Sequence, residues 1–255
     1  MFSQVPCIRV NGAEFTSSVH EVAVEEPVAL FVNGRHALTA MMSPYMIREF
    51  VTGFLYTERI IHAPDEIESI RFDEKRVSVL TKNPFRILAS KKTVLSGCGG
   101  STSFLDVGKL PKVVSDLSVT REEVRAAIKG VLSSELHTLT GGVHVVGLLE
   151  HDRVIVVAED IGRHNALDRV IGFGLLNDVS FGRTFVVSSG RISSEMVRKC
   201  LIAGIPVIVS RGATTSLAVE VASQTGVTLI GFARGEKMNI YTCPERFVGA
   251  PGSGP

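Results

Sequence analysis

Residues 185–210, FVVSSGRISSEMVRKCLIAGIPVIVS, decide the fold. The stretch opens and closes on short apolar runs, residues 185–189 and 207–210, whose length and β-branched content are typical of buried strands. Between them, residues 193–203 have the pattern of a helix that ends at Gly204, with Pro206 just beyond. A strand, a helix and a strand in this order predict two parallel neighbours in one sheet.

The same rhythm extends in both directions from this stretch. Thr120 is expected to cap a helix that runs to Leu136, with Glu123 completing a capping box. The order over the second half is then α-β-β-α-β-α-β-α-β, which predicts a sheet covered by helices on both faces. The remaining expected strands are residues 143–150, 154–158 and 228–233, and the remaining helices are residues 165–176 and 216–225, the last ending at Gly226.

The first half has short strands and one helix instead. Asn33-Gly34 separates two strand-like runs, residues 28–32 and 36–42, and predicts a tight hairpin turn. Ser43-Pro44 predicts the start of a helix with Ser43 as its N-cap. Further strands are expected at residues 19–24, 67–72 and 77–81. We therefore predict a small α+β domain over residues 1–115, a three-layer α/β/α domain over 116–247 and a flexible tail over 248–255.

Composition narrows the classes of function. The 255 residues carry 27 Lys and Arg against 26 Asp and Glu, so a net charge of +1 gives no bulk attraction to nucleic acid or to an acidic membrane surface. No apolar run reaches the roughly 20 residues that a membrane span needs. The first ten residues do not have the pattern of a signal peptide. We expect a cytoplasmic protein with reduced thiols.

The four cysteines lie far apart in the sequence, which excludes a local CxxC pair and makes a disulfide scaffold improbable. Cys98 stands between glycines in a run of small residues, Ser96-Gly97-Cys98-Gly99-Gly100-Ser101-Thr102-Ser103. Successive backbone N–H groups in such a loop can hold an anion, which is the environment that a thiolate or persulfide needs. The alternative is a small residue in a tight turn. Cys200 is expected in the core, and Cys7 and Cys243 lie near the ends of the chain.

Three strand-to-helix loops of the predicted sheet share an arginine among glycines and small hydroxyl residues. Ligands of open sheets bind at such loops. Helix starts with free N–H groups, together with arginines, suit a phosphate. The loops therefore indicate a phosphorylated or nucleotide-like ligand, although acid/base chemistry at the first loop and simple helix capping with solvated charges stay open as alternatives. The loops are Glu159-Asp160-Ile161-Gly162-Arg163-His164-Asn165, Ser188-Ser189-Gly190-Arg191-Ile192-Ser193 and Ser210-Arg211-Gly212-Ala213-Thr214-Thr215-Ser216.

A fourth segment, Phe232-Ala233-Arg234-Gly235-Glu236-Lys237, follows the last expected strand. It offers an aromatic ring for stacking, two cations and a glycine that allows close backbone approach, although a solvated turn would look similar. The chain has neither GxGxxG nor GxxxxGK[ST], so the usual dinucleotide-binding and P-loop sites lack support.

A comparison with zinc deaminases predicts that no metal is bound. The order of elements over residues 120–240 suits a cytidine-deaminase-like sheet, and such enzymes need H-x-E at one helix start and P-C-x-x-C at the next. Here His164 is followed by Ala166 at the Glu position, and the other helix start, Gly190-Arg191-Ile192-Ser193-Ser194, has no cysteine. Zinc-activated water is therefore not expected.

Taken together, several long motifs in sequence order resemble the formate dehydrogenase accessory sulfurtransferases of the FdhD type, over about residues 20 to 247. In the first half these are Glu26-Pro27, Val32-Asn33-Gly34 and Gly53-Phe54-Leu55-Tyr56-Thr57-Glu58. In the second half they are Thr140-Gly141-Gly142-Val143-His144, the loop from Glu159 to Ala166, Ser189-Gly190-Arg191-Ile192-Ser193-Ser194-Glu195-Met196, the loop from Ser210 to Ala218, and Gly231-Phe232-Ala233-Arg234.

The resemblance implies an N-terminal α/β domain, a deaminase-like second domain without zinc, and a role in sulfur transfer. Such proteins accept sulfur from a cysteine desulfurase as a cysteine persulfide. They pass it to molybdenum bis(molybdopterin guanine dinucleotide), Mo-bis-MGD, for formate dehydrogenase. The persulfide cysteine maps onto Cys98, and the cofactor-binding segment maps onto Phe232, Ala233, Arg234, Gly235, Glu236 and Lys237. Arg163, His164 and Arg191 are further candidates for the pocket. Apart from the resemblance, a homodimer is compatible with the sequence because homodimers are common among soluble proteins.

One position departs from the family pattern. Many members carry C-G-x-C-G where this chain has Cys98-Gly99-Gly100-Ser101-Thr102, so Ser101 replaces a second cysteine. No neighbouring thiol is then present to resolve a persulfide as an internal disulfide, which argues against a relay between two cysteines and favours a single-cysteine carrier. The rival function is a chaperone that delivers the molybdenum cofactor without transferring sulfur. A hydrolase that uses Cys98 and His164 would need those two side chains within hydrogen-bond reach.

Overall fold

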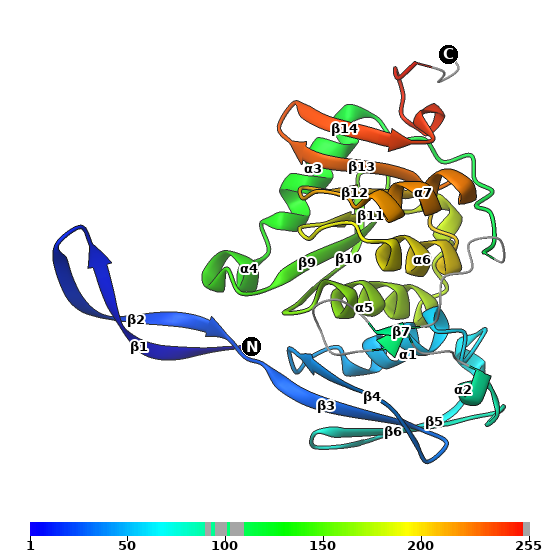
Figure 1. Cartoon of the computed structure of the whole chain (residues 1–255), viewed down its shortest axis with the longest axis horizontal. Helices are drawn as coiled ribbons and strands as arrows, with labels where there is room; N and C mark the ends of the chain where they lie inside the picture. Colours follow the sequence, from blue (N-terminus) through cyan, green and yellow to red (C-terminus); the bar gives the residue numbers. More distant parts are fainter. Residues whose placement is uncertain (90–92, 95–100, 103–109, 252–255) are drawn as a thin grey trace.

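A six-stranded sheet forms the centre of the second half of the chain (Figure 1). The computed structural model describes residues 1–89, 93–94, 101–102 and 110–251. The order across the sheet is β10-β9-β11-β12-β13-β14. Its strands are β9 (His144–Glu150), β10 (Arg153–Asp160), β11 (Phe185–Ser188), β12 (Val207–Ser210), β13 (Thr228–Arg234) and β14 (Lys237–Thr242). β11, β12 and β13 are parallel, and β10 runs with them because both β10 and β11 are antiparallel to β9. Four strands therefore end at one edge of the sheet.

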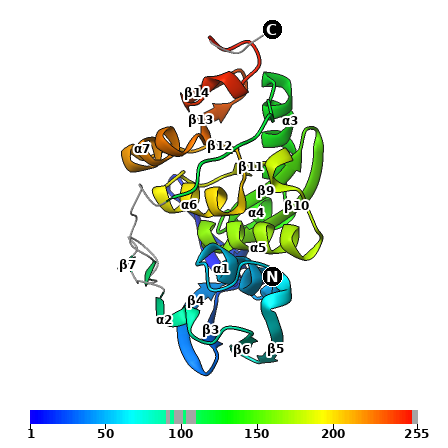
Figure 2. The same cartoon turned by 90° about the vertical axis from the view of Figure 1, so that its right-hand side faces the viewer.

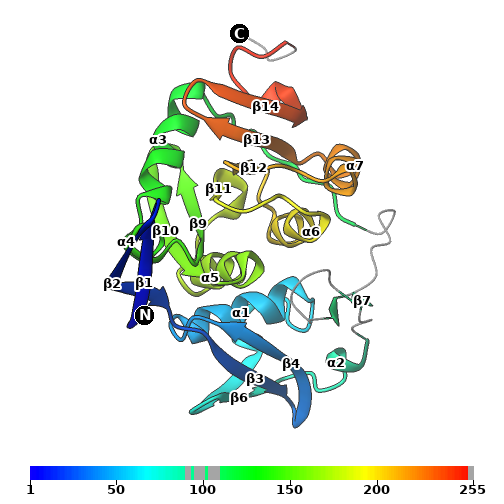
Figure 3. The ribbon, with the colours of Figure 1, turned by 60° about the vertical axis from the view of Figure 1, so that its left-hand side comes forward.

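Helices cover both faces of this sheet, as the alternation of elements predicted. α3 (Arg121–Leu132) lies on one face, and α5 (Arg163–Leu176), α6 (Ser194–Ala203) and α7 (Ser216–Thr225) lie on the other (Figure 3). Side chains of a strand alternate between faces, so β11 contributes to two cores: Val186 packs with α5 to α7, and Phe185 and Val187 pack with α3.

Two expectations for this half are wrong. The helix that begins at Thr120 ends at Leu132, and a second helix, α4 (Glu135–Thr140), follows it. The chain turns at Ser133 and Ser134, whose hydroxyls compete with helical hydrogen bonds; the Ser134 hydroxyl donates to the Glu159 carboxylate at 2.5 Å. The capping box is confirmed, since the Glu123 amide donates to Thr120 Oγ1 at 3.1 Å and the Thr120 amide donates to the Glu123 carboxylate at 2.7 Å. The second error is the absence of β14 from the expected elements.

A four-stranded sheet of order β4-β3-β6-β5 organises the first half. It consists of β3 (Glu26–Val32), β4 (Arg35–Met42), β5 (Ile67–Asp73) and β6 (Arg76–Thr81), and α1 (Ile47–Thr57) packs on one face of it. The hairpin turn is confirmed: Asn33 and Gly34 both have positive φ, 50° and 77°, which a tight two-residue hairpin requires and which these residue types allow. Pieces of secondary structure between this sheet and α3 are α2 (Arg86–Ala89), β7 (Thr93–Val94) and β8 (Ser101–Thr102).

Ser43 does not cap α1. The N-cap residue is Met46, whose backbone has a left-handed conformation. Instead its backbone is bonded to the second half of the chain: the Ser43 amide donates to Asp160 Oδ2 at 3.0 Å, and its carbonyl accepts from the Arg169 guanidinium at 2.6 Å. Asp160 and Arg169 are themselves a fully buried ion pair at 2.6 Å. The residue before Pro44 therefore joins the two sheets instead of starting a helix.

The two halves meet where α1 crosses α5 at very short range (Figure 2). Gly53 of α1 and Gly172 of α5 make this possible. A Cβ atom at Gly53 would lie 1.9 Å from the Asp168 carbonyl oxygen, and one at Gly172 would lie 1.8 Å from the Glu49 carbonyl oxygen. Any side chain at either position would force the helices apart.

The first 23 residues form a long hairpin of β1 (Phe2–Asn11) and β2 (Glu14–Ala23), which projects from the rest of the molecule (Figure 1). None of the helices in the described part of the chain is long and apolar enough to cross a membrane. The boundary near residue 115 stays a prediction, and of the expected tail only residues 248–251 fall within the described part.

Candidate functional site

The carboxyl ends of β10, β11, β12 and β13 bring the predicted loops together at one edge of the sheet. The Ile192 amide donates to the Ala213 carbonyl at 2.9 Å, and the Thr215 amide donates to the Ile192 carbonyl at 3.1 Å, so the second and third loops are paired. The Phe232 amide donates to the Gly212 carbonyl at 2.9 Å, which adds the fourth segment. The loops are neighbours, as the parallel topology predicted.

Glycines set how tightly these loops pack. A Cβ atom at Gly190 would lie 3.1 Å from both Arg163 Cδ and His144 Nδ1, and one at Gly212 would lie 3.3 Å from the backbone of Arg191. Both distances are at the tight end of real contacts. Gly190 therefore places the first loop, the second loop and the start of β9 in direct contact.

Positive charge collects along this edge. Arg163 lies in the first loop, Arg191 in the second, Arg211 in the third and Arg234 at the end of β13. Arg191, Arg211 and Arg234 are exposed, and the Arg234 guanidinium donates to the Arg211 carbonyl at 3.2 Å.

His144, at the start of β9, lies in the electrostatic field of these positive charges. Burial lowers the pKa of His144, and the positive charges of Arg163, His137 and Arg191 lower it further. The imidazole is therefore neutral at physiological pH, and it can accept or donate one hydrogen bond toward a ligand without adding charge. A cationic edge with backbone amides and a neutral imidazole can bind a phosphate or pyrophosphate group.

Some residues of the predicted cofactor segment are exposed to solvent, and others pack against or pair with α3. Phe232, Ala233 and Arg234 complete β13, Gly235 and Glu236 form the turn, and Lys237 begins β14. Phe232 and Arg234 are exposed, with the guanidinium 5.9 Å from the ring centroid. Ala233 is buried in the core beneath α3, and Glu236 forms an ion pair of 2.6 Å with Arg125 of that helix. Phe232 has a positive φ of 51°, which marks an irregular end to the strand.

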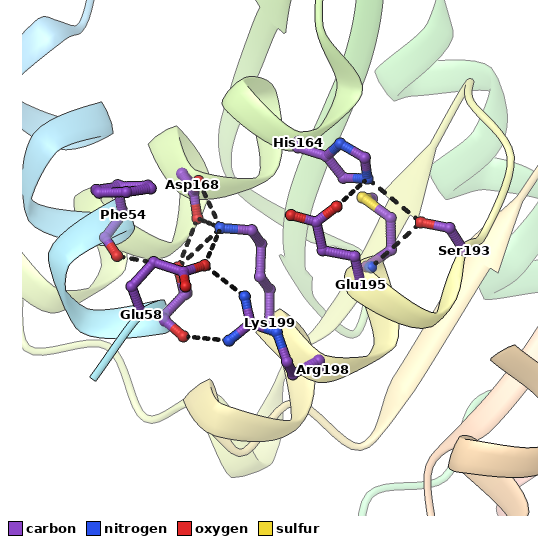
Figure 4. Close-up of polar contacts among 10 residues, drawn as sticks. Phe54, Glu58, His164, Asp168, Ser193, Glu195, Arg198 and Lys199 are labelled. Carbon is purple, nitrogen blue, oxygen red and sulfur yellow. Dashed lines mark hydrogen bonds and ion pairs between the residues drawn. The ribbon is translucent and has the colours of Figure 1, made fainter. Parts of the chain in front are cut away.

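His164, at the start of α5, points inward instead of along the edge (Figure 4). Its Nε2 atom lies 3.2 Å from Glu195 Oε2 and 3.3 Å from Ser193 Oγ. Burial lowers the pKa of His164 to about 2, and the charges of Arg163 and Lys199 act in the same direction. Burial also raises the pKa of Glu195. Burial therefore disfavours the charged form of both groups, so this contact is not a strong ion pair.

A buried cluster of charges lies next to this pair, at the junction of α1, α5 and α6 (Figure 4). Lys199 Nζ lies 2.8 and 2.9 Å from the two Asp168 oxygens and 3.0 Å from Thr57 Oγ1. Arg198 donates to the Glu58 carboxylate and to the Thr57 carbonyl, the latter at 2.8 Å. Burial alone would lower the pKa of Lys199, but the Asp168 and Glu58 carboxylates outweigh it and raise the pKa. Burial also raises the pKa of Asp168, and the Lys199 ammonium beside it acts in the opposite direction. The ammonium, the guanidinium and both carboxylates of the cluster all have hydrogen-bond partners within it.

The three cysteines that the structure describes differ in burial, as the sequence predicted. Cys200 is fully buried and burial raises the pKa of its thiol, so it is an inert core residue. Cys7 is exposed on β1, and Cys243 is partly buried between β14 and a short 3₁₀ turn, where burial raises its pKa. Cys98 lies outside the described residues. The nearest residues on either side that are described, Val94 and Ser101, are paired as strand neighbours.

Sequence reasoning missed several residues of this region. His144 entered only as part of a motif, yet it begins an antiparallel strand, and such a strand starts at the edge where its parallel neighbours end. Lys199 and Glu195 were not selected either. The available signal was three charged residues, Glu195, Arg198 and Lys199, in a short helix that connects two buried strands. Among the residues that the structure describes, no group of three or more His, Cys, Asp or Glu side chains could hold a metal ion.

The fold and the site define a mixed α/β protein with a cationic edge at the carboxyl ends of its parallel strands and a buried ionic junction between its two sheets. Within that class, the chain belongs to the FdhD/NarQ family, whose model matches residues 23–248.

Its relatives include proteins described as sulfur carrier protein FdhD. The one from Wolinella succinogenes is 38% identical over 92% of this chain and 85% of its own length, and the one from Bacillus pumilus is 34% identical over 91% and 92%. A crystal structure from Desulfotalea psychrophila, described as a candidate formate dehydrogenase accessory protein, has a TM-score of 0.79 and 30% identity over 97% of this chain and 99% of that one.

Proposed function

We propose that this protein is a sulfur carrier that serves formate dehydrogenase. It accepts sulfur from a cysteine desulfurase as a persulfide on Cys98 and transfers it to Mo-bis-MGD, which is its substrate. The relatives named as sulfur carriers match nearly the whole chain, which supports the carrier role. The single structural observation that carries the proposal is the row of cations at the carboxyl ends of the parallel strands, because Mo-bis-MGD presents pyrophosphate and guanine groups.

The proposed loading step uses one nucleophile. The Cys98 thiolate attacks the outer sulfur of the donor persulfide, a new S–S bond forms at Cys98, and the donor cysteine leaves as a thiolate. Release of that sulfur as sulfide consumes two electrons, which a reduced molybdenum centre supplies. Both steps require the reacting sulfur atoms to be held in position, and neither requires an acid or base residue.

The edge residues would bind the substrate. In this proposal Arg163, His164, Arg191 and the segment from Phe232 to Lys237 form the nucleotide-like pocket, and His144 and Arg211 join them because the structure places both at the same edge. The strand order of the second half, with β9 antiparallel to its neighbours, supports a cytidine-deaminase-like sheet over residues 116–247. His164, which faces Glu195, contributes to this pocket by holding the first loop in place.

Substitution of the carrier thiol tests the proposal. Cys98→Ala should abolish activation of a co-produced formate dehydrogenase, because Cys98 is the residue onto which the family resemblance maps the persulfide, and the buried thiol of Cys200 cannot replace it. Cys7→Ala, at an exposed cysteine on the projecting hairpin, is the matched control and should activate normally. Full activation by Cys98→Ala would exclude the carrier role.

A cofactor chaperone that transfers no sulfur is the second candidate. Ser101 favours it, because the second loop cysteine of many family members is missing here. In that case Cys98→Ala would still bind a guanine nucleotide and would still deliver an active cofactor.

A further inference from the structure

The β13–β14 hairpin departs from a regular ladder at the carboxyl edge of the sheet. Gly231 pairs with Asn239 there, and the register shifts on either side of that pair. The pairing skips Tyr241 of β14 at one shift and Phe232 of β13 at the other. Such β-bulges re-aim the side chains that they release from the ladder, and they are common beside active sites. The hairpin therefore directs two aromatic rings out of the regular pattern at the edge that carries the cations.

Phe232 holds a backbone conformation that an aromatic residue rarely adopts. Its φ of 51° lies in the left-handed region, where a β-carbon crowds the backbone. Its amide donates to the Gly212 carbonyl at 2.9 Å, which fixes this strained strand end against the third loop. The ring is 40% exposed, so packing within the chain does not account for the strain. Strain of this kind gathers at ligand-binding sites, and here it presents the ring to solvent.

Tyr241 lies across β13 because Gly231 leaves room for it. A Cβ atom at Gly231 would lie 3.0 Å from Tyr241 Cε2 and 3.4 Å from the Gly212 carbonyl oxygen, so the ring crosses the strand at the level of the third loop. Leu229 packs in the core beneath α5 to α7, and Gly231, two residues further along the strand, faces the same side. The tyrosine therefore lies on the α7 side of the hairpin, opposite α3 (Figure 3).

Asn239 and Tyr241 present a linked pair of polar groups at this place. Both side chains are exposed, and Asn239 Nδ2 donates to Tyr241 Oη at 3.3 Å. A phenol can accept one hydrogen bond and still donate its own proton, and an amide can donate and accept at the same time. Within the described part of the chain, neither the tyrosine proton nor the Asn239 carbonyl oxygen has a further partner. The pair therefore offers a ligand one donor beside one acceptor.

We propose that Asn239 and Tyr241 are specificity-determining residues, which bind the 2-amino-4-oxopyrimidine edge that guanine and pterin share, while Phe232 stacks on the ring. The ring carbonyl accepts from the Tyr241 hydroxyl, and the neighbouring N–H group donates to the Asn239 carbonyl oxygen. Adenine has an amine in place of that carbonyl, so it would set a donor against the tyrosine donor. Because Mo-bis-MGD is the proposed substrate, this role rests on the proposed function.

The cations of the edge lie where the phosphates of such a ligand would follow. The Arg234 guanidinium lies 5.9 Å from the centroid of the Phe232 ring and donates to the Arg211 carbonyl at 3.2 Å. A heterocycle stacked on Phe232 would therefore have two arginines beside it. Asn239 and Tyr241 lie beyond the segment from Phe232 to Lys237, and they reach the same edge because β14 returns antiparallel to β13.

Calorimetry of the full chain with GDP, ADP and pyrophosphate tests this role. The wild type should bind GDP at least about tenfold more tightly than ADP. Tyr241→Phe keeps the ring and removes only the hydroxyl, and it should weaken GDP binding about tenfold while ADP and pyrophosphate bind as before. Asn239→Ala should act in the same way. Asn177→Ala, the same change at the C-terminal end of α5, is the control and should bind all three normally.

The ratio of GDP to ADP affinity decides the outcome. Phe232→Ala should weaken both nucleotides and leave pyrophosphate unchanged, because stacking does not depend on the identity of the base. A wild type without preference for GDP, or Tyr241→Phe and Asn239→Ala variants that keep the wild-type ratio, overturns the proposal. Equal loss of all three ligands in those variants also overturns it, because that is a purely structural effect. A wild type that binds neither GDP nor pyrophosphate contradicts the proposed function and this role with it.

Competition with pterin-6-carboxylate distinguishes the two rings of the substrate. This compound carries the same edge without a pyrophosphate. Displacement of GDP from the wild type, lost in Tyr241→Phe, would show that the site takes pterin as well, whereas GDP that stays bound at saturating pterin would assign the site to guanine. Either result supports recognition of the shared edge. Displacement that Tyr241→Phe leaves unchanged contradicts it.

Discussion

Two clusters of charge in this molecule have opposite designs. At the α1–α5–α6 junction, Lys199 and Arg198 are buried and each is matched by a carboxylate, Asp168 or Glu58. At the carboxyl edge of the sheet, Arg191, Arg211 and Arg234 are exposed, and no ion pair of theirs with a carboxylate is found among the described residues. Buried charges are expensive unless they are paired, whereas exposed ones are cheap.

The difference shows which cluster serves structure and which is available to a ligand. The junction joins the two halves of the chain through groups that are already hydrogen-bonded to one another. The edge keeps cations that an anionic ligand can still engage. Changes at the junction should therefore alter stability, and changes at the edge should alter binding.

The largest effect is expected from unpairing the junction. Asp168→Ala leaves the Lys199 ammonium buried without its main partner and should reduce the free energy of unfolding by about 3–5 kcal/mol. Urea denaturation measures this. The double variant Asp168→Leu with Lys199→Met removes both charges and should recover most of the loss. If the single variant loses less than the double, the pairing is not what stabilises the junction.

Acid should act on the same region through His164. Because its folded pKa, about 2, lies below that of an unfolded histidine, near 6.5, the unfolded chain takes up a proton that the folded chain does not. His164 therefore does not reduce the free energy of unfolding above pH 7, and it reduces that free energy increasingly as the pH falls below 6.5.

Replacement of this histidine isolates its contribution. Between pH 7 and 5 the wild type should lose about 2 kcal/mol more than His164→Gln. Urea denaturation at pH 5, 6, 7 and 8 measures both, and the two curves should run parallel from pH 7 to 8. Parallel curves over the whole range would mean that His164 is protonated in the folded state.

The smallest effect on stability, and the largest on binding, is expected at the edge. Arg234→Ala should weaken binding of a guanine nucleotide such as GDP about tenfold, through loss of a charge-assisted contact, and should change the unfolding free energy by less than about 0.5 kcal/mol. Calorimetry measures the affinity. Arg153→Ala, at the start of β10 and hence at the opposite edge, is the control and should bind normally. Equal affinities for both variants would remove Arg234 from the pocket.

The loops of the edge could be predicted because their signals are local. Thr120, Gly204 and Gly226 mark helix ends, and short apolar runs mark buried strands, so the alternation of elements and the parallel edge followed. The neighbouring position of Arg163, Arg191 and Arg211 is then a consequence of topology.

The junction could not be predicted in the same way. Lys199 pairs with residues 31 and 141 positions away in the sequence, and no local pattern announces such partners. Ser43 shows the same limit: Ser-Pro is a good helix start, but the buried Asp160–Arg169 pair bonds its backbone and moves the helix start to Met46. Long-range polar contacts overrode local preference at both places.

Mass spectrometry of Cys98 tests the central claim most directly. The full chain is incubated with a cysteine desulfurase and cysteine, digested without reductant, and compared with Cys98→Ala and Cys7→Ala. The carrier account predicts that the Cys98 peptide gains the mass of one sulfur atom, in the wild type and in Cys7→Ala, and loses it when reduced molybdenum cofactor is added. A Cys98 peptide that stays unmodified while the protein still binds the cofactor would contradict the account.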